Sequence, residues 1–223
     1  MYKIYEQPFD YKTLDNNVVL IDVLRAATVA NVVLSKNPVV YFMSANEDEI
    51  NIIKQKNKNA VTIGKRQKNI YTYPNSPSVL RRVRISINIF LGADLNKRCV
   101  LHSSAACGGM LDKLKKHNVL LCGFCNISAT ADYIQNSNLD WSIVCCGFRG
   151  EERNDEDKLC ADMITKNINS NQNDIFLNLK DSESLTIFEK NQQDYPKKDI
   201  EICLTLDMFS FPIKAKENII TKA

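Results

Sequence analysis

The feature that most constrains the fold of this chain is its alternation of short apolar segments with segments of helical composition. Apolar runs such as residues 18–23 and 119–124 have the length of buried β-strands and are far too short to cross a membrane. Runs of this kind, each followed by a helix-like segment, are typical of a largely parallel sheet with helices on both faces. We therefore predict an α/β fold with three layers, α/β/α, and a largely parallel or mixed sheet. Residues 1–223 are expected to form one domain, with a two-lobed arrangement as the alternative.

The expected elements follow from apolar runs and capping residues. Strands are expected at residues 18–23, 39–43, 60–64, 99–102, 118–124 and 141–146, and helices at residues 26–34, 109–116, 129–135 and 155–167. Two further helices have start signals, with Ser44 as one N-cap and Ser76, followed by Pro77, as the other. Residues 168–199 are polar and are expected to form a surface excursion with one short helix at 184–190. Two final strands are expected at residues 199–207 and 213–220.

Composition and charge exclude several classes of protein. The 44% of hydrophobic and 25% of charged residues are usual for globular domains and exclude a disordered or collagen-like chain. The net charge is only +3, and the basic cluster Arg81, Arg82 and Arg84 has no interleaved aromatic residues, so we predict no nucleic-acid partner. The first residues lack the apolar core of a secretion signal. We therefore expect a cytoplasmic protein without a membrane partner.

The eight cysteines are expected to be reduced and mostly structural. Most of them lie in or beside apolar runs, where a free thiol behaves as a small hydrophobic group. Cys122 and Cys125 have the spacing of a redox or zinc pair, but no redox-motif context or second pair with zinc spacing accompanies them. The spacing along the chain therefore predicts neither a disulfide framework nor a zinc site.

Polar residues that suit an anionic ligand and a metal ion follow several of the expected strands. In open α/β sheets, ligands bind at the carboxyl ends of the strands. Arg25 offers a charged fork for phosphate or sulfonate, and the turn at residues 103–109 offers hydroxyls and N–H groups to an oxyanion. The acidic run at residues 151–157 offers carboxylate oxygens, which hard divalent cations prefer.

Each of these patterns also has a purely structural interpretation. Asp22 and Arg25 fit a structural salt bridge, and the small residues of the turn at 103–109 fit an ordinary helix cap. Acidic residues in a first turn stabilise a helix through its dipole. His102 lies beside the candidate site, whereas His117 fits a cation at a helix C-terminus. The residues alone therefore leave both a binding site and structural roles open.

Several segments, in order along nearly the whole chain, resemble the motifs of one known family. Ile21-Asp22-Val23-Leu24-Arg25-Ala26-Ala27-Thr28 is similar to the Asp-Val-Leu-Arg-Ala-Thr/Ser segment of the 2-phosphosulfolactate phosphatases. The other similar segments are Asn75-Ser76-Pro77, His102-Ser103-Ser104-Ala105, residues 123–129, Glu156-Asp157-x-x-Cys160-Ala161 and residues 199–207.

The resemblance implies an α/β/α fold and Mg²⁺-dependent hydrolysis of a phosphate ester on a small sulfonated hydroxy acid, a step of coenzyme M biosynthesis. The residues expected in catalysis are Asp22, Arg25, Arg66, Ser103, Ser104 and Asn126. Those expected to bind the substrate are Arg25, Lys65, Arg66, Asn75, Ser76, Ser103 and Ser104. Those expected to hold Mg²⁺ are Asp22, Glu156 and Asp157. Attack by Asp22 and direct attack by water both remain open.

Three departures from the family pattern bear on activity. Lys65 stands where the family usually has Glu, Thr72 where it has Asp, and Ala106-Cys107 where it has Gly-Thr. The lost carboxylates matter if they hold Mg²⁺ or act as a base, and do not matter if they only orient a loop. We predict a phosphoric monoester hydrolase, with a non-catalytic paralogue that binds a small phosphorylated or sulfonated acid as the alternative. The expected partner is a small anionic substrate, and a homodimer is left open.

Overall fold

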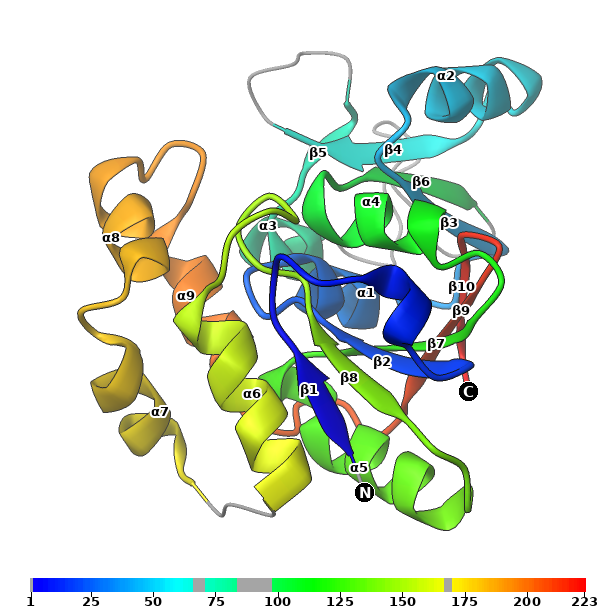
Figure 1. The fold of residues 1–223 in the computed structure, drawn as a ribbon. Helices are drawn as coiled ribbons and strands as arrows, with labels where there is room; N and C mark the ends of the chain where they lie inside the picture. Colours follow the sequence, from blue (N-terminus) through cyan, green and yellow to red (C-terminus); the bar gives the residue numbers. More distant parts are fainter. Residues whose placement is uncertain (1, 66–70, 84–97, 167–169) are drawn as a thin grey trace.

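The computed structural model describes residues 2–65, 71–83, 98–166 and 170–223. Within these residues a ten-stranded mixed sheet runs in the order β1-β8-β2-β7-β9-β10-β3-β6-β4-β5 (Figure 1). Neighbouring strands are parallel except at β9 and β10, which are antiparallel to each other and to β7 and β3. The strands are β1 (Lys3–Tyr5), β2 (Asn17–Ile21), β3 (Val40–Ser44), β4 (Val61–Gly64), β5 (Tyr73–Pro74), β6 (Cys99–Ser103), β7 (Asn118–Cys122), β8 (Ser142–Cys145), β9 (Ile213–Lys216) and β10 (Ile219–Lys222).

Helices cover both faces of this sheet. The α-helices of the described residues are α1 (Ala26–Leu34), α2 (Glu47–Lys56), α3 (Pro77–Arg82), α4 (Ala106–Lys113), α5 (Ile127–Asn136), α6 (Asp155–Lys166), α7 (Gln172–Leu179), α8 (Glu183–Lys190) and α9 (Lys197–Cys203). The first core cluster includes buried residues of α1, α3 and α4, and the second includes those of α5 to α9 (Figure 1). None of these helices is both long and apolar enough to span a membrane.

The central strand β2 shows why the apolar runs are continuous. Val18 and Leu20 belong to the first cluster, whereas Val19 and Ile21 belong to the second. Successive side chains of a strand point to opposite faces, and all four are fully buried, so both faces of the strand are covered. The structure confirms the predicted α/β fold with a largely parallel, mixed sheet between layers of helices.

The strands β2, β7 and β8 end at the same level, which brings the segments that follow them together. The backbone N–H of Asp22 donates to the carbonyl of Cys122 at 3.2 Å, and that of Cys146 donates to the carbonyl of Ile21 at 2.8 Å. Gly147 then turns the chain with a φ of 72°, and a Cβ there would lie 2.0 Å from a backbone carbonyl oxygen. Only glycine fits this turn, which leads the chain from β8 back over the end of the sheet.

The expected strand at residues 199–207 is wrong. Residues 199–203 belong to α9, and residues 204–207 form a turn. Pro196 precedes this helix, where its missing N–H costs nothing, and the buried residues Asp199, Ile200 and Cys203 recur with helical spacing. The β-branched residues of this segment suggested a strand, but its contacts with α3 and α8 favour the helix.

The polar stretch at residues 168–199 is more than a surface excursion. Its residues 168 and 169 lie outside the described residues. It forms α7 and α8, and α8 matches the expected short helix at 184–190. Ile175 and Leu179 of α7 and Leu185 and Phe188 of α8 are buried in the second core cluster. Their spacing of three or four residues is that of amphipathic helices, which the polar composition of the stretch obscures.

Two smaller corrections concern turns. Asn46, not Ser44, is the N-cap of α2, because its side-chain oxygen accepts the N–H groups of Asp48 and Glu49. The expected final strand at residues 213–220 is a hairpin of β9 and β10. Ser76 is the N-cap of α3 and Pro77 its first residue, as predicted.

Candidate active site

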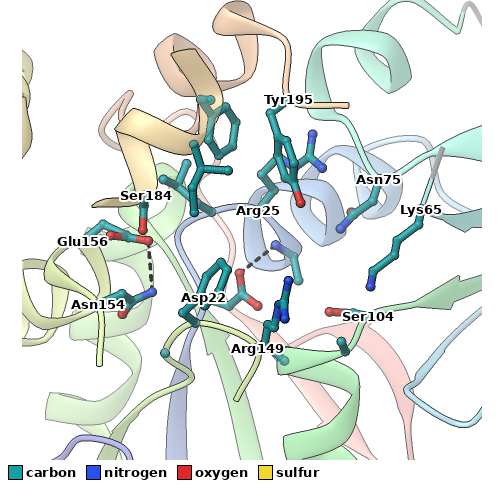
Figure 2. A pocket seen from close by; sticks show the side chains of 18 residues that line it. Asp22, Arg25, Lys65, Asn75, Ser104, Arg149, Asn154, Glu156, Ser184 and Tyr195 are labelled. Carbon is teal, nitrogen blue, oxygen red and sulfur yellow. Dashed lines mark hydrogen bonds between the residues drawn. The ribbon is translucent and has the colours of Figure 1, made fainter. Parts of the chain in front are cut away.

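A cavity opens at the carboxyl end of the sheet, between the ends of β2, β4, β6 and β8 and the cover formed by α8 and the segment before α9 (Figure 2). This is the edge at which open α/β sheets bind their ligands. The residues that line it are Asp22, Leu24, Arg25, Ala26, Lys65, Asn75, Ser104, Ala105, Ala106, Gly147, Phe148, Arg149, Asn154, Glu156, Ser184, Ile187, Phe188 and Tyr195.

Asp22 follows β2 directly and lies on the floor of the cavity. Its side-chain oxygen Oδ1 accepts the backbone N–H of Ala26 at 2.9 Å, which fixes the carboxyl group against the first turn of α1. Burial raises the pKa of Asp22 to about 6, although the N–H groups of Ala26 and Cys107 and the charge of Arg25 oppose this shift. The carboxyl group is therefore close to its ionisation midpoint in mildly acidic solution.

Two further buried carboxyl groups come from the first turn of α6. Glu156 lines the cavity: its Oε1 accepts the side-chain amide of Asn154 at 3.0 Å, and its buried Oε2 has no hydrogen-bond partner among the residues that the structure describes. Asp157 lies behind the cavity wall, where its two oxygens accept the backbone N–H groups of Val23 (2.8 Å) and Gly147 (3.0 Å). Asp157 thus joins the chain after β2 to the chain after β8.

The three carboxyl groups share an acidic environment. Burial raises the pKa of both Glu156 and Asp157, and the charge of Asp22 adds to both shifts. Within the described part of the chain, no lysine or arginine lies within ion-pair distance of any of the three. An unpaired buried carboxylate is costly, so this group would gain stability from a cation.

Arg25 is held by contacts from the cover of the cavity. Its guanidinium donates to Oδ2 of Asp199 at 2.7 Å and to the carbonyl of Asp194 at 3.1 Å. The aromatic rings of Phe188 and Tyr195 lie 5.5 and 4.8 Å from the guanidinium carbon, within cation–π range. These contacts fix one geometry for a side chain that would otherwise be mobile.

Asp199 links this arginine to a second segment of the site. Its other oxygen, Oδ1, accepts the hydroxyl of Ser76 at 2.8 Å and the backbone N–H of Ser78 at 2.9 Å. The carboxylate is fully buried and all of these contacts are short. Asp199 therefore fixes Arg25 and the segment that begins at Asn75 relative to each other.

Asn75 is oriented by a buried histidine. Nε2 of His102 and Oδ1 of Asn75 are 2.9 Å apart, and Nδ1 of His102 lies 2.7 Å from the hydroxyl of Tyr41. Burial lowers the pKa of His102 to about 3, so the ring is neutral and carries one N–H. The amide oxygen can only accept, so Nε2 donates to it, and Nδ1 accepts the Tyr41 hydroxyl. The amide N–H₂ group of Asn75 is left to face the cavity.

Acidic side chains lie on one side of the cavity, and cations and hydrogen-bond donors lie on the other (Figure 2). We call Asp22 and Glu156 the acidic wall. We call the opposing set the donor wall; it consists of Arg25, Lys65, Asn75 and Ser104. Arg149, which also lines the cavity, adds a further cation beside Asp22 in this view. A ligand that combines a divalent cation with a multiply charged anion would satisfy both walls.

Comparison with known proteins gives this arrangement its context. The family model described as 2-phosphosulpholactate phosphatase matches residues 2–218. The chain belongs to the 2-phosphosulfolactate phosphatase family. A probable 2-phosphosulfolactate phosphatase from Caldanaerobacter subterraneus subsp. tengcongensis is 26% identical over 246 aligned residues, which cover 98% of this chain and 95% of that protein. The resemblance that the sequence motifs indicated is thereby confirmed at the level of the family.

The structure brings many of the residues expected from the family motifs to one cavity. Those that line it are Asp22, Arg25, Lys65, Asn75, Ser104 and Glu156. Four others lie outside the lining, namely Ser76, Ser103, Asn126 and Asp157. Arg66 lies outside the described residues.

The four residues outside the lining include three with clear structural contacts. Asn126 is fully buried: its side chain accepts the N–H of Gly123 and donates to the carbonyl of Leu121, which closes the turn after β7. Ser76 caps α3, and Asp157 accepts two backbone N–H groups. The geometry gives these residues positioning contacts, and their expected direct roles in phosphatase chemistry stay predictions.

Of the three departures from the family pattern, two reach the cavity lining, namely Lys65 and the Ala106 of Ala106-Cys107. Lys65 lines the cavity at the end of β4. Thr72 is exposed and pairs with Thr62 through hydroxyl and backbone hydrogen bonds. Cys107 is buried beneath the lining. Lys65 is the departure that brings a charged side chain into the lining, so it is best placed to change the electrostatics of the cavity.

Two cavity residues, Ser184 and Tyr195, had no signal in a sequence read segment by segment, because they belong to the polar stretch expected at the surface. Arg149 and Asn154 instead belong to the segment after β8, where polar residues were expected at the site. The cover reaches the cavity through contacts between residues far apart in the chain, such as Arg25 with Asp199. The family motif around residue 199 pointed to the importance of this segment without indicating its partner.

Proposed function

We propose that this protein hydrolyses a phosphate ester on a small sulfonated hydroxy acid with the help of Mg²⁺. The observation that carries the proposal is the division of the cavity into two walls. Buried carboxyl groups, which have no ion-pair partner among the described residues, face a set of cations and hydrogen-bond donors. Family membership supplies the substrate class, since the curated relative is named a probable 2-phosphosulfolactate phosphatase.

The residues of the acidic wall fit a magnesium ion. Mg²⁺ prefers oxygen ligands, commonly one or two carboxylates together with water and phosphate oxygens. Asp22 and Glu156 would hold it, because both line the cavity and Oε2 of Glu156 is buried without a hydrogen-bond partner in the described part of the chain. When bound, the ion would supply charge neutralisation for the phosphate and activation of a water molecule.

The donor wall fits the anionic groups of such a substrate. A phosphorylated, sulfonated acid carries phosphate, sulfonate and carboxylate groups, and the cavity provides three cationic side chains, Arg25, Lys65 and Arg149. Arg25 would bind an oxyanion in a geometry fixed by Asp199, while Asn75 and Ser104 would donate hydrogen bonds. In the transition state these donors would stabilise charge on the transferred group. Arg66 is proposed as a further cation on the strength of the family motif alone.

A second candidate function is binding of such an anion without catalysis. Lys65 favours it, because an ammonium group in the cavity strengthens binding of dianions and opposes a divalent cation. Arg25, Asn75 and Ser104 would serve this function without change. The two candidates therefore differ in the role of the acidic wall, which would bind Mg²⁺ for catalysis only in the phosphatase.

The test is a phosphatase assay on a panel of phosphate esters that includes 2-phosphosulfolactate, with and without added Mg²⁺. We expect Mg²⁺-dependent release of phosphate that is lost in Asp22→Asn and Glu156→Gln. The matched control is Asp162→Asn, which removes another carboxylate of α6 that pairs with Lys158 and Lys166 instead of lining the cavity. Binding of the ester without turnover would support the paralogue, and absence of both would refute both candidates.

A further inference from the structure

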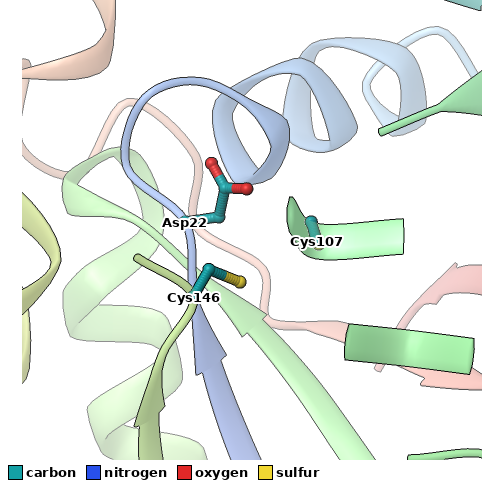
Figure 3. A group of neighbouring side chains, drawn as sticks. All are labelled: Asp22, Cys107 and Cys146. Carbon is teal, nitrogen blue, oxygen red and sulfur yellow. The ribbon is translucent and has the colours of Figure 1, made fainter. Parts of the chain in front are cut away.

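Three potential metal ligands meet just beneath the cavity. Asp22 follows β2, Cys107 lies in the first turn of α4, and Cys146 follows β8 (Figure 3). A carboxylate oxygen and the two sulfur atoms all lie within 4.8 Å of one another, and all three residues are buried. All eight cysteines of the chain are free, so neither sulfur belongs to a disulfide.

The distances suit a tetrahedral ion after a small adjustment. Three atoms that are no more than 4.8 Å apart leave a point within about 2.8 Å of each, compared with about 2.3 Å for a zinc–sulfur bond. Each ligand would move by about half an ångström, which χ1 rotation of a cysteine or aspartate readily provides. No rearrangement of the strand ends is required.

The chemistry of this ligand set differs from that of the acidic wall. Two sulfur ligands and one carboxylate select Zn²⁺ and similar thiophilic ions, whereas Mg²⁺ prefers oxygen ligands. Cys107 and Cys146 also belong to the first apolar core cluster, which would shield their bonds to a metal from water.

The cavity gives an ion both access and a fourth coordination position. Asp22 itself lines the cavity, and so do Ala106 and Gly147, the chain neighbours of the two cysteines. A site with three protein ligands and one open position has the composition of known zinc centres that bind water or an anion.

Another pair of neighbouring cysteines, Cys122 and Cys160, lacks, within the described part of the chain, the third ligand that this site has. Burial and the neighbouring thiol of Cys122 raise the pKa of Cys160, yet the two cysteines belong to no three-ligand group among the residues that the structure describes. Spacing along the chain could not reveal the site, because its three ligands come from three separate segments.

We propose that Asp22, Cys107 and Cys146 form a binding site for a thiophilic divalent cation such as Zn²⁺. Binding replaces the two thiol protons by metal–sulfur bonds and releases these protons to solvent. Because the site takes Asp22 from the acidic wall, the bound ion excludes Mg²⁺ from the cavity. This last step rests on the proposed function, whereas the site itself does not.

Cobalt substitution tests the site directly. Co²⁺ added to the reduced, metal-free protein should bind with one equivalent and produce sulfur-to-cobalt charge-transfer absorption and the visible bands of tetrahedral Co²⁺, and Zn²⁺ should abolish both. Cys107→Thr and Cys146→Ser should lose the charge-transfer signal, and the control Cys160→Ala should keep it. Absence of the signal in the unmodified protein, or its retention in both cysteine variants, would overturn the proposal.

Calorimetric titration with Mg²⁺, before and after one equivalent of Zn²⁺, tests the competition. Zn²⁺ should weaken Mg²⁺ binding at least tenfold in the unmodified protein and leave it unchanged in Cys107→Thr. Equal Mg²⁺ affinity with and without Zn²⁺ would overturn the exclusion step. Failure of Mg²⁺ to bind under either condition would refute the proposed metal-dependent function and the exclusion step, while the cobalt spectra decide the thiophilic site by themselves.

Discussion

The two walls of the cavity are held in place by different kinds of contact. Backbone N–H groups at the ends of β2 and β8 position the acidic side: Ala26 donates to Asp22, and Asp157 ties the two strand ends together behind Glu156. Contacts between side chains position the donor wall: Arg25 donates to Asp199, and His102 donates to Asn75. One side is therefore positioned by backbone groups at the strand ends and the other by contacts between side chains.

The walls also differ in how their charge is compensated. Arg25 has a buried counter-ion in Asp199, whereas the carboxyl groups of Asp22, Glu156 and Asp157 raise one another's pKa or have it raised by burial. A folded protein tolerates such an acidic group by binding protons or by binding a cation. The comparison therefore teaches that the acidic wall is the part of the site with the greater need of a ligand, since Arg25, the buried cation of the donor wall, already has a counter-ion.

The largest effect is expected from breaking the anchor of the donor wall. Asp199→Asn leaves the guanidinium of Arg25, with a side-chain exposure of 10%, without its counter-ion. Removing one partner of a buried ion pair costs about 3–5 kcal/mol, so the free energy of unfolding should fall by that amount. Urea unfolding followed by circular dichroism measures it.

Asp157→Asn is the matched change behind the acidic wall. The asparagine can accept only one of the N–H groups of Val23 and Gly147, which costs about 1–3 kcal/mol, but it also relieves repulsion with Glu156. Its loss of stability should therefore be smaller than that of Asp199→Asn. The reverse order would contradict the distinction between the walls.

The second prediction concerns the pH dependence of the acidic wall. Because the pKa of Asp22 is raised from 3.8 to about 6, the unfolded chain loses this proton at lower pH than the folded chain does. The stability contributed by Asp22 is therefore fully present below the unfolded pKa and is lost as pH rises from about 4 to about 6, by on the order of 3 kcal/mol.

Urea unfolding with a chelator present, at several pH values across this window, measures the decline. Asp22→Asn should reduce it, and the remainder should reflect Glu156 and Asp157, whose pKa values are also raised. Added Mg²⁺ should lessen the decline in the unmodified protein, because a bound cation stabilises the charged carboxylates. A profile identical in the Asp22→Asn variant would show that Asp22 does not titrate in this range.

The difference between the acidic wall and the donor wall also explains how much of the molecule could be predicted from the sequence. Apolar runs located β2, β3, β4, β6, β7 and β8, because a strand buried on both faces leaves a continuous hydrophobic signal. The edge strands β1 and β5, of three and two residues, leave almost none. The acidic wall was accessible for the same reason, since Asp22 and Glu156 follow strands that could be found.

The donor wall was only partly accessible. Arg25 and Lys65 follow predicted strands, but the contact of Arg25 with Asp199 joins residues 174 positions apart. Asp199 was expected in a strand, and no local pattern shows that a buried carboxylate in a helix meets an arginine. Asn126 and Asp157 show a different gap: no sequence pattern indicated the hydrogen bonds through which they hold turns together, while their expected direct roles stay predictions.

The third prediction tests the orientation of Asn75 on the donor wall. In Asn75→Asp the new carboxylate still accepts Nε2–H of His102, but it presents an oxygen to the cavity where the amide presented N–H₂. Loss of a hydrogen bond to a charged group costs about 2 kcal/mol, so affinity for inorganic phosphate should fall about thirtyfold.

Calorimetric titration with phosphate measures this loss. The matched control is Asn154→Asp, the same substitution beside Glu156, where the asparagine donates to a carboxylate and belongs to the acidic side. It should weaken phosphate binding less than Asn75→Asp does. Equal losses would mean that added negative charge, rather than the donor orientation set by His102, accounts for the effect.

We expect Lys65→Glu to change stability least among these variants. Its effect on ligand affinity is the most informative one for function. Lys65 is exposed on the cavity rim, so the change should leave the free energy of unfolding nearly unchanged. It exchanges a cation of the donor wall for the carboxylate that the family usually has. Two unit charges a few ångströms apart in a partly wet cleft interact by about 1 kcal/mol or more, so Mg²⁺ affinity should rise about fivefold or more and phosphate affinity should fall.

Thr72, the other lost carboxylate, pairs with Thr62 away from the cavity lining, so we expect turnover to rise with Mg²⁺ affinity in this variant. The measurement is a titration with Mg²⁺ together with phosphatase assays of both forms. Lys58→Glu, at the other end of β4, makes the same charge change outside the lining and should alter neither affinity. If the unmodified protein already hydrolyses 2-phosphosulfolactate efficiently at low Mg²⁺, the ammonium of Lys65 does not oppose the metal, and the donor wall tolerates either charge at this position.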